Sequence, residues 1–288
     1  MGLKIHRAPK IPGNRRAGVP IRPNAGLERD YRKKLLALVD EMYASVTWWI
    51  GAEYRSQLPR IMEYDRAQDA SPAAELMQAL KRRLRQWQRR FDDKAGMIAQ
   101  WFARQALKST SAAVAASVAG AVGGTAAGVA VQFQMTRAMN NAVASIVFEN
   151  TSLIRSLPQK AFLEIEGLVM RGVRTGYDAG RLTEELQQRF GVTRRRAEFI
   201  SRDQMNKATE ALSRVRMTEL GITEAVWIHT GTGRQPRPSH VRFNGQVFEL
   251  ARGMYDEDAQ KWVQPGELPN CYCTKRPLIP AYEKRRGA

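Results

Sequence analysis

The chain has 288 residues, of which 43% are hydrophobic, so it can bury a sizeable core and is not a wholly disordered protein. Its 46 Lys and Arg residues outnumber 28 Asp and Glu residues, and the formal net charge of +18 indicates an anionic partner. Nucleic acid is the first candidate for that partner and an anionic membrane surface is the second. The N-terminus lacks the apolar stretch of a secretory signal, and the two cysteines, Cys271 and Cys273, are too close in sequence for an unstrained disulfide. We therefore expect synthesis and folding in the cytosol.

Residues 1–26 are rich in Pro, Gly and Arg and show no periodic apolar pattern, which predicts a basic extended arm. Residues 1–108 carry 22 basic and 11 acidic side chains, so most of the positive excess lies in this part of the chain. Such an arm can lie on DNA, thread into a neighbouring subunit, or remain a disordered tail, and the sequence leaves these alternatives open. The candidate DNA contacts in the arm are Arg15, Arg16 and Arg22.

Residues 27–155 form a predicted helical region, because apolar side chains recur there at steps of three and four. One such stripe begins at Tyr31, and another runs from Leu84 to Trp101. The outer face of the second helix carries further candidate DNA contacts, namely Lys81, Arg82, Arg83, Arg85, Arg89 and Arg90. A run of charge on a helix is usually a solvated face, but a run of one sign repels itself and favours a nearby anion.

Residues 109–136 contain no charged side chain. Their length would span a bilayer, but Ala and Gly dominate the segment and drive insertion poorly. Gly120, Gly124 and Gly128 recur at four-residue steps, which lets helices approach closely. We expect a tightly packed helix pair, with a segment that meets the host membrane as the alternative.

Residues 156–288 are predicted to form three helices followed by a small sheet. The expected helices start at Pro158, at Thr183 and at Thr193, and the last of them ends at Gly221. Residues 223–230 alternate as a strand with both faces buried. Asn244–Gly245 is a two-residue turn signal between two further short strands. The predicted fold is mainly α: an elongated helical bundle followed by a small α+β C-terminal module with a short antiparallel sheet.

An ordered set of motifs over residues 156–280 resembles the phage head-morphogenesis domain, the Mu F-like minor head proteins. The set begins with the helix RAEFISR, continues with a Gly before the Trp227 strand and an Arg–x–x–His step (Arg237, His240), and ends with Gly245 and a Pro–Gly segment that leads to Cys271 and Cys273. The resemblance assigns residues 156–288 to this domain, with Trp227, Arg237, His240, Gly245, Cys271 and Cys273 as its motif residues. The N-terminal half resembles the family only loosely.

The resemblance implies a minor virion protein of a tailed bacteriophage, present in a few copies in the head interior near the portal and made in the cytoplasm of a bacterial host. Its implied partners are the portal protein, other head proteins and packaged double-stranded DNA. Its implied roles are head assembly and retention, packaging or ejection of the genome. The family provides no catalytic residues, so we expect a protein that is not an enzyme.

The closing cysteines raise the question of a structural zinc ion. Related proteins carry further Cys and His ligands where this chain has Arg237 and Glu267–Leu268. Three good candidate ligands remain, His240, Cys271 and Cys273, with His229 as a candidate for the fourth position. Because these ligands are missing, we expect apolar and hydrogen-bonded contacts to hold the loop without any cofactor. In this arrangement Arg237 pairs with a carboxylate such as Glu267, and His240 caps a loop. Zinc binding stays the alternative.

Two other functions compete with the head-protein interpretation. His229, His240 and Asn244 suggest a metal-dependent nuclease, but the nearby acidic run Asp256–Glu257–Asp258 has the pattern of a solvated turn. The uncharged segment 109–136 suggests instead a membrane-active ejection protein, for which the host membrane would be a partner during ejection.

Overall fold

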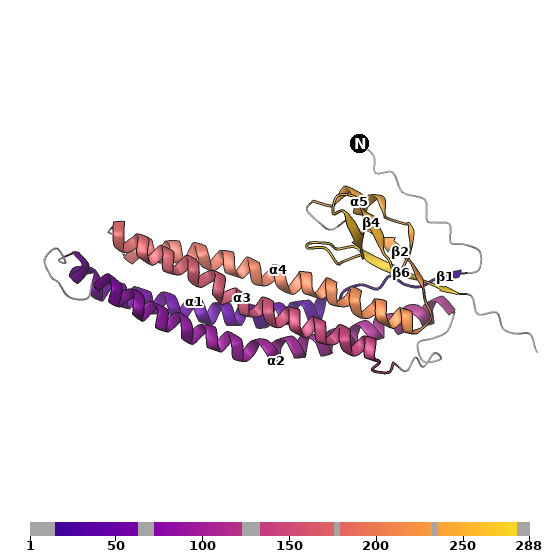
Figure 1. Ribbon diagram of the computed structural model, residues 1–288, viewed down its shortest axis with the longest axis horizontal. Helices are drawn as coiled ribbons and strands as arrows, with labels where there is room; N and C mark the ends of the chain where they lie inside the picture. The colour runs from indigo at the N-terminus through magenta and orange to yellow at the C-terminus, as the bar shows by residue number, and fades with distance from the viewer. Residues whose placement is uncertain (1–14, 63–71, 123–132, 176–178, 232–234, 281–288) are drawn as a thin grey trace, which may run out of the picture. The chain divides into compact units, whose positions relative to one another are not determined.

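The computed structural model describes residues 15–62, 72–122, 133–175, 179–231 and 235–280. Long helices dominate these residues: α1 (Ala25–Met62), α2 (Pro72–Val122), α3 (Arg137–Thr175) and α4 (Ala179–Glu219). Short strands follow α4, so the predicted mainly α fold with a small C-terminal antiparallel sheet is confirmed (Figure 1). The chain divides into two compact units. We call residues 29–101 and 147–202 the helical unit, and residues 1–28, 102–146 and 203–288 the sheet unit.

The helical unit contains segments of all four long helices, and each buries an apolar stripe. On α1 the predicted stripe is buried from Tyr31 onward, and on α2 the predicted stripe is buried at Leu84, Trp87, Phe91 and Ala95. Each fully buried large apolar side chain contributes about 1.5–3 kcal/mol. The three- and four-residue spacing therefore places enough apolar area on one face of each helix to hold this unit together.

Buried polar contacts set the alignment of the helices within the helical unit. The Tyr31 hydroxyl donates to Asn150 Oδ1 at 2.7 Å, which joins α1 to α3. The Tyr43 hydroxyl lies 2.9 Å from the Thr193 hydroxyl, which joins α1 to α4. Burial raises the pKa of Tyr31 above its usual range, so this side chain stays a neutral hydrogen-bond donor.

All three predicted helix starts are wrong. Thr183 lies inside α4, which begins at Ala179, and the predicted end of its short helix at Gly191 lies inside the same helix. Pro158 lies inside α3 instead of opening a helix, because buried Leu157 and Ala161 keep the surrounding turns packed although proline removes one backbone hydrogen bond. Thr193 lies inside α4, where its hydroxyl lies 3.3 Å from the Arg189 carbonyl instead of capping a new helix. The predicted end is confirmed, since Gly221 follows α4 with a positive φ of 72°.

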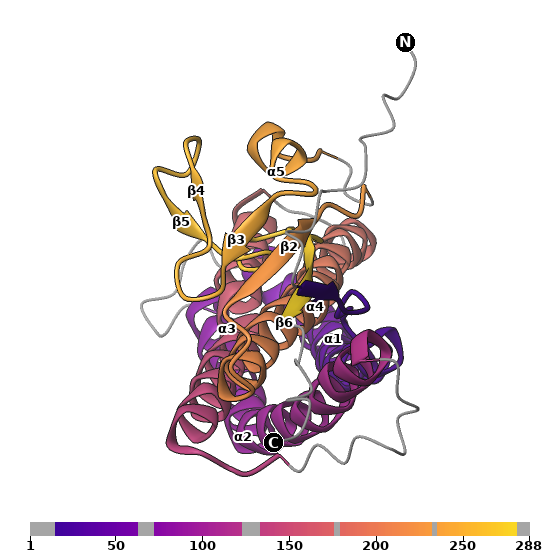
Figure 2. The same ribbon diagram turned by 90° about the vertical axis from the view of Figure 1, so that its right-hand side faces the viewer.

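The sheet unit contains a four-stranded antiparallel sheet in the order β1-β6-β2-β3 (Figure 2). Its strands are β1 (Arg15–Ala17), β2 (Glu224–Ile228), β3 (Val247–Glu249) and β6 (Thr274–Pro280). A separate hairpin pairs β4 (Met254–Asp256) with β5 (Lys261–Val263). Ala225, Val226 and Trp227 of β2 are fully buried, which confirms the predicted strand with two buried faces.

The segment before the Asn244–Gly245 turn is helical, which corrects the strand expected there. Helix α5 (Pro238–Arg242) begins with a proline at its first turn, where the missing N–H costs nothing. Gly245 has a φ of 82°, and its N–H donates to the Trp227 carbonyl at 2.8 Å. The turn therefore folds α5 directly onto β2.

The described part of the basic arm is bound within its own chain. Residues Arg15–Ala17 pair with β6, and the Gly18 N–H donates to the Pro277 carbonyl at 2.9 Å. The Ser117 hydroxyl of α2 donates to the Val19 carbonyl at 2.7 Å. Residues 1–14 of the expected arm lie outside the described residues.

The uncharged segment is only partly described. Residues 109–122 complete α2, and residues 133–136 lead into α3. Gly124 and Gly128 of the predicted glycine ridge fall in the undescribed stretch. Among the described residues, no helix combines the length and the apolar character needed to cross a bilayer.

Candidate functional site

Three potential metal ligands, His240, Cys271 and Cys273, meet in the sheet unit, and His229 lies beside Cys273. Short elements position each of these residues. His240 lies on α5, His229 directly follows β2, and Cys271 and Cys273 directly precede β6. Because Ile228 pairs with Thr274 in the antiparallel β2–β6 ladder, the same register brings His229 opposite Cys273. Residues far apart in the sequence therefore meet at one end of two neighbouring strands.

Nitrogen and sulfur atoms face each other within this cluster. His240 Nδ1 lies 3.3 Å from Cys271 Sγ and 3.7 Å from Cys273 Sγ. His229 Nδ1 lies 3.5 Å from Cys273 Sγ. His240, Cys271 and Cys273 are buried, and one ligand atom from each lies within 4.8 Å of the others. The arrangement can be held by hydrogen bonds alone, or it can hold a metal ion that favours nitrogen and sulfur.

Asp256 supports the cluster from the β4–β5 hairpin. Its Oδ2 lies 3.1 Å from His240 Nε2, and its Oδ1 accepts the backbone N–H groups of Asp258 at 2.9 Å and Ala259 at 3.2 Å. Burial alone would raise the pKa of Asp256, but these hydrogen bonds and nearby His240 hold it below its usual value. The expected solvated turn is therefore wrong for Asp256, which is fully buried, although Glu257 and Asp258 are exposed.

The two thiols are not equivalent. The hydrogen bond with Cys273 and the contact with His240 lower the pKa of the Cys271 thiol. The same hydrogen bond, together with burial, raises the pKa of Cys273. The Gly266 N–H also donates to Cys271 Sγ at 3.3 Å. Burial lowers the pKa of His229, which favours the neutral imidazole that a metal requires.

Two further motif residues, Trp227 and Arg237, pack or hydrogen-bond around the cluster. Trp227 is fully buried and packs edge-on against His240 with ring centroids 5.2 Å apart. Arg237 donates to the Pro269 carbonyl at 3.0 Å instead of pairing with the expected Glu267. Glu267 accepts the Gln264 N–H at 2.8 Å, because it lies in the same turn as Gln264. The guanidinium of Arg237 thus ties α5 to the loop that carries the cysteines.

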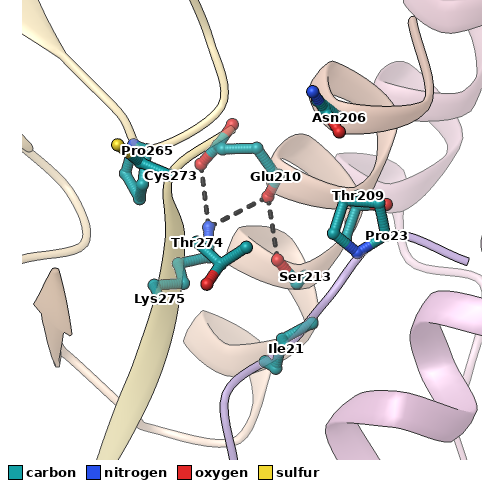
Figure 3. Close-up of a pocket in the computed structure, with 10 residues that line it drawn as sticks. All are labelled: Ile21, Pro23, Asn206, Thr209, Glu210, Ser213, Pro265, Cys273, Thr274 and Lys275. Carbon is teal, nitrogen blue, oxygen red and sulfur yellow. Dashed lines mark hydrogen bonds and ion pairs between the residues drawn. The ribbon is translucent and has the colours of Figure 1, made fainter. Parts of the chain in front are cut away.

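A buried ion pair near the cluster was not anticipated from the sequence. Lys275 Nζ lies 2.9 Å from Glu210 Oε1 and 3.0 Å from the Glu210 carbonyl (Figure 3). Both residues are buried, and the contact joins β6 to α4. Burial lowers the pKa of Lys275, against the opposing pull of Glu210. The one available signal was strand alternation, which puts Lys275 on the same face as Pro277 and Ile279.

The candidate DNA contacts fall into two groups, one in each unit. In the sheet unit, Arg15 forms an ion pair with Glu224, Arg16 is exposed with one guanidinium nitrogen 3.5 Å from the Ala121 carbonyl, and Arg22 is exposed. In the helical unit, the basic face of α2 is solvent-exposed at five positions, namely Lys81, Arg82, Arg85, Arg89 and Arg90. Arg83 is half-buried and lies 3.4 Å from Gln86 Oε1. The exposed cations of α2 therefore form one basic patch, whereas Arg15 is already ion-paired with Glu224.

Comparison with known proteins finds a family likeness over part of the chain. Residues 163–276, which contain the whole His/Cys cluster, match the family model described as Phage Mu protein F like protein. The chain is also 30% identical over 137 residues to an uncharacterized protein of Haemophilus influenzae. That match covers 48% of this chain, which spans only 29% of the relative's length. No solved structure matches the chain.

Residues 163–276 therefore form a Mu F-like region, and the resemblance expected from the sequence is confirmed there.

Proposed function

We propose that this chain is a minor head protein of a tailed bacteriophage, which acts in head assembly beside the portal protein and in retention, packaging or ejection of the genome. The match of residues 163–276 to the Mu F-like family carries this proposal. The proposed location is the head interior near the portal, with a few copies in each virion. Other head proteins are further proposed partners.

The cluster geometry supports a structural role better than a nuclease role. His240 is only 2% exposed, and its two ring nitrogens face Asp256 and Cys271. A general base must reach its substrate within hydrogen-bond distance. Asn244 accepts the backbone N–H of His229 at 2.9 Å, so it also serves the local fold. These contacts favour a structural role for the cluster over a catalytic one.

The proposed DNA contact rests on the basic face of α2. Lys81, Arg85 and Arg89 follow one another at four-residue steps, so they line one side of the helix over about 12 Å. Within the described residues, no carboxylate lies at ion-pair distance from Arg82, Arg85 or Arg89. This face can neutralise phosphates without reading bases.

A salt titration with matched charge variants tests the contact. Replacing Arg82, Arg85 and Arg89 together by Ala should weaken duplex binding and reduce the slope of log affinity against log salt by about 2.7, since each phosphate contact contributes about 0.9. The control replaces three exposed basic residues of α3, namely Lys160, Arg171 and Arg174, by Ala. Equal losses in both variants, or a slope near zero in the unmodified chain, would contradict a DNA-contacting α2 face.

The assembly role has a separate test. A phage that lacks this chain should yield defective heads or heads that lose their DNA, and the full-length chain supplied from a plasmid should restore them. Normal yields of filled, infectious particles without the chain would contradict the proposal.

A further inference from the structure

Three nitrogen–sulfur distances at the His/Cys cluster match those of a tetrahedral metal site. Zinc binds sulfur at about 2.3 Å and nitrogen at about 2.0–2.1 Å, so a nitrogen and a sulfur on one tetrahedral ion lie about 3.6 Å apart. The three N···S distances of the cluster are 3.3, 3.7 and 3.5 Å. All three lie within about 0.3 Å of the tetrahedral value.

The groups around the ligands are those that a metal site requires. His240 presents Nδ1 to both sulfurs, while its Nε2 faces the buried carboxylate of Asp256. A carboxylate on the distal ring nitrogen is the usual device that orients a metal-bound histidine. The Gly266 N–H points at Cys271 Sγ and helps to stabilise a thiolate.

A bound ion would stabilise the local fold, because the strands around the cluster are short. Three of the strands around the cluster, β3, β4 and β5, have only three residues each. The ligands come from the end of β2, from α5 and from the segment before β6, so one ion would connect three separate pieces of chain. Small modules with short strands commonly rely on such a link.

We propose that the sheet unit binds one zinc ion in a structural site formed by His240, Cys271 and Cys273, with His229 as the fourth ligand. Two thiolates and two imidazoles favour zinc over the hard cations, which prefer oxygen. His240, Cys271 and Cys273 are at most 6% exposed. The site is therefore closed, and the ion stabilises the fold without meeting a substrate.

Metal analysis of the purified full-length chain tests the proposal first. We expect roughly one zinc ion per chain, the stoichiometry of a single four-ligand site. The Cys271→Ser and Cys273→Ser variants should lose this zinc, whereas Phe243→Leu should keep it. Phe243 stacks on His240 at 5.9 Å but offers no ligand, so it separates loss of packing from loss of a ligand. Zinc retained by either cysteine variant would overturn the proposal.

Cobalt substitution provides a readout that depends on the ligands rather than on folding. The chelator-stripped, reduced chain should bind Co²⁺ with thiolate charge-transfer absorption and the visible bands of a tetrahedral ion. A folded chain that contains no zinc and develops no such spectrum would overturn the proposal. Replacing His229 by Ala should weaken Co²⁺ binding by more than the roughly 10–100-fold typical of an outer-shell change, and unchanged affinity would overturn the assignment of His229.

Discussion

His240 and Asp256 form a fully buried pair, with His240 Nε2 3.1 Å from Asp256 Oδ2. The pair joins α5 to the β4–β5 hairpin, two elements that otherwise belong to different parts of the C-terminal segment. Asp256 also accepts two backbone N–H groups of its own turn. One carboxylate therefore closes the hairpin turn and fixes the orientation of the histidine.

Replacing Asp256 by Ala should destabilise the sheet unit strongly. The change leaves His240 and two backbone N–H groups without their acceptor, and each unsatisfied buried group costs about 1–3 kcal/mol. We expect at least about 2 kcal/mol in chemical denaturation. Asp258→Ala is the matched control, because Asp258 is an exposed carboxylate two residues away and should change stability by less than about 0.5 kcal/mol. Equal effects of the two variants would contradict the role of Asp256.

Loss of the Lys275–Glu210 ion pair should also be costly. Lys275→Met leaves the Glu210 carboxylate buried beside Arg214, and removing one partner of a buried pair typically costs about 3–5 kcal/mol. The double variant Lys275→Met/Glu210→Gln should recover part of that loss. Lys261→Met is the control, because Lys261 lies 4.0 Å from Glu267 on an exposed strand. Urea denaturation measures the free energy of unfolding of all three variants. An unchanged free energy in Lys275→Met would show that the pair does not stabilise the fold.

Gly18 is required where the N-terminal segment meets α2 and β6. A Cβ at this position would overlap Ser117 Oγ and would lie 2.9 Å from Pro277 Cγ. Gly18→Ala should therefore cost about 1–3 kcal/mol, the usual range for overpacking, and should speed proteolysis after the arm. Gly120→Ala should be harmless, since its Cβ would meet only Val19 Cγ2 at an ordinary 3.6 Å. Identical protease sensitivity in the two variants would contradict this account of β1 docking.

Periodic patterns in the sequence predicted the long helices and the β2 strand well. The buried stripes of α1 and α2 follow the three- and four-residue spacing, and the Ala225–Trp227 segment is buried as expected. Local start signals were less informative, because Pro158, Thr183 and Thr193 lie within continuous helices that tertiary packing maintains. A single proline or threonine therefore identifies a helix boundary only when the neighbouring apolar spacing also breaks.

The site was only partly predictable. The motif contains His240, Cys271 and Cys273, and His229 is a further candidate ligand in the sequence. Strand register brings His229 opposite Cys273. The motif did not give Asp256, which lies in an acidic run that has the composition of a surface turn. Nor did it give the β1–β6 pairing, because a three-residue strand rich in arginine has no periodicity to detect. Contacts between residues so distant in sequence require the fold itself.

Mass spectrometry of purified particles tests the central claim most directly. DNA-filled heads of the phage that encodes this chain should contain it in a few copies per particle, and chemical cross-linking should join it to the portal protein. Finished, infectious particles that lack the chain altogether would contradict the account.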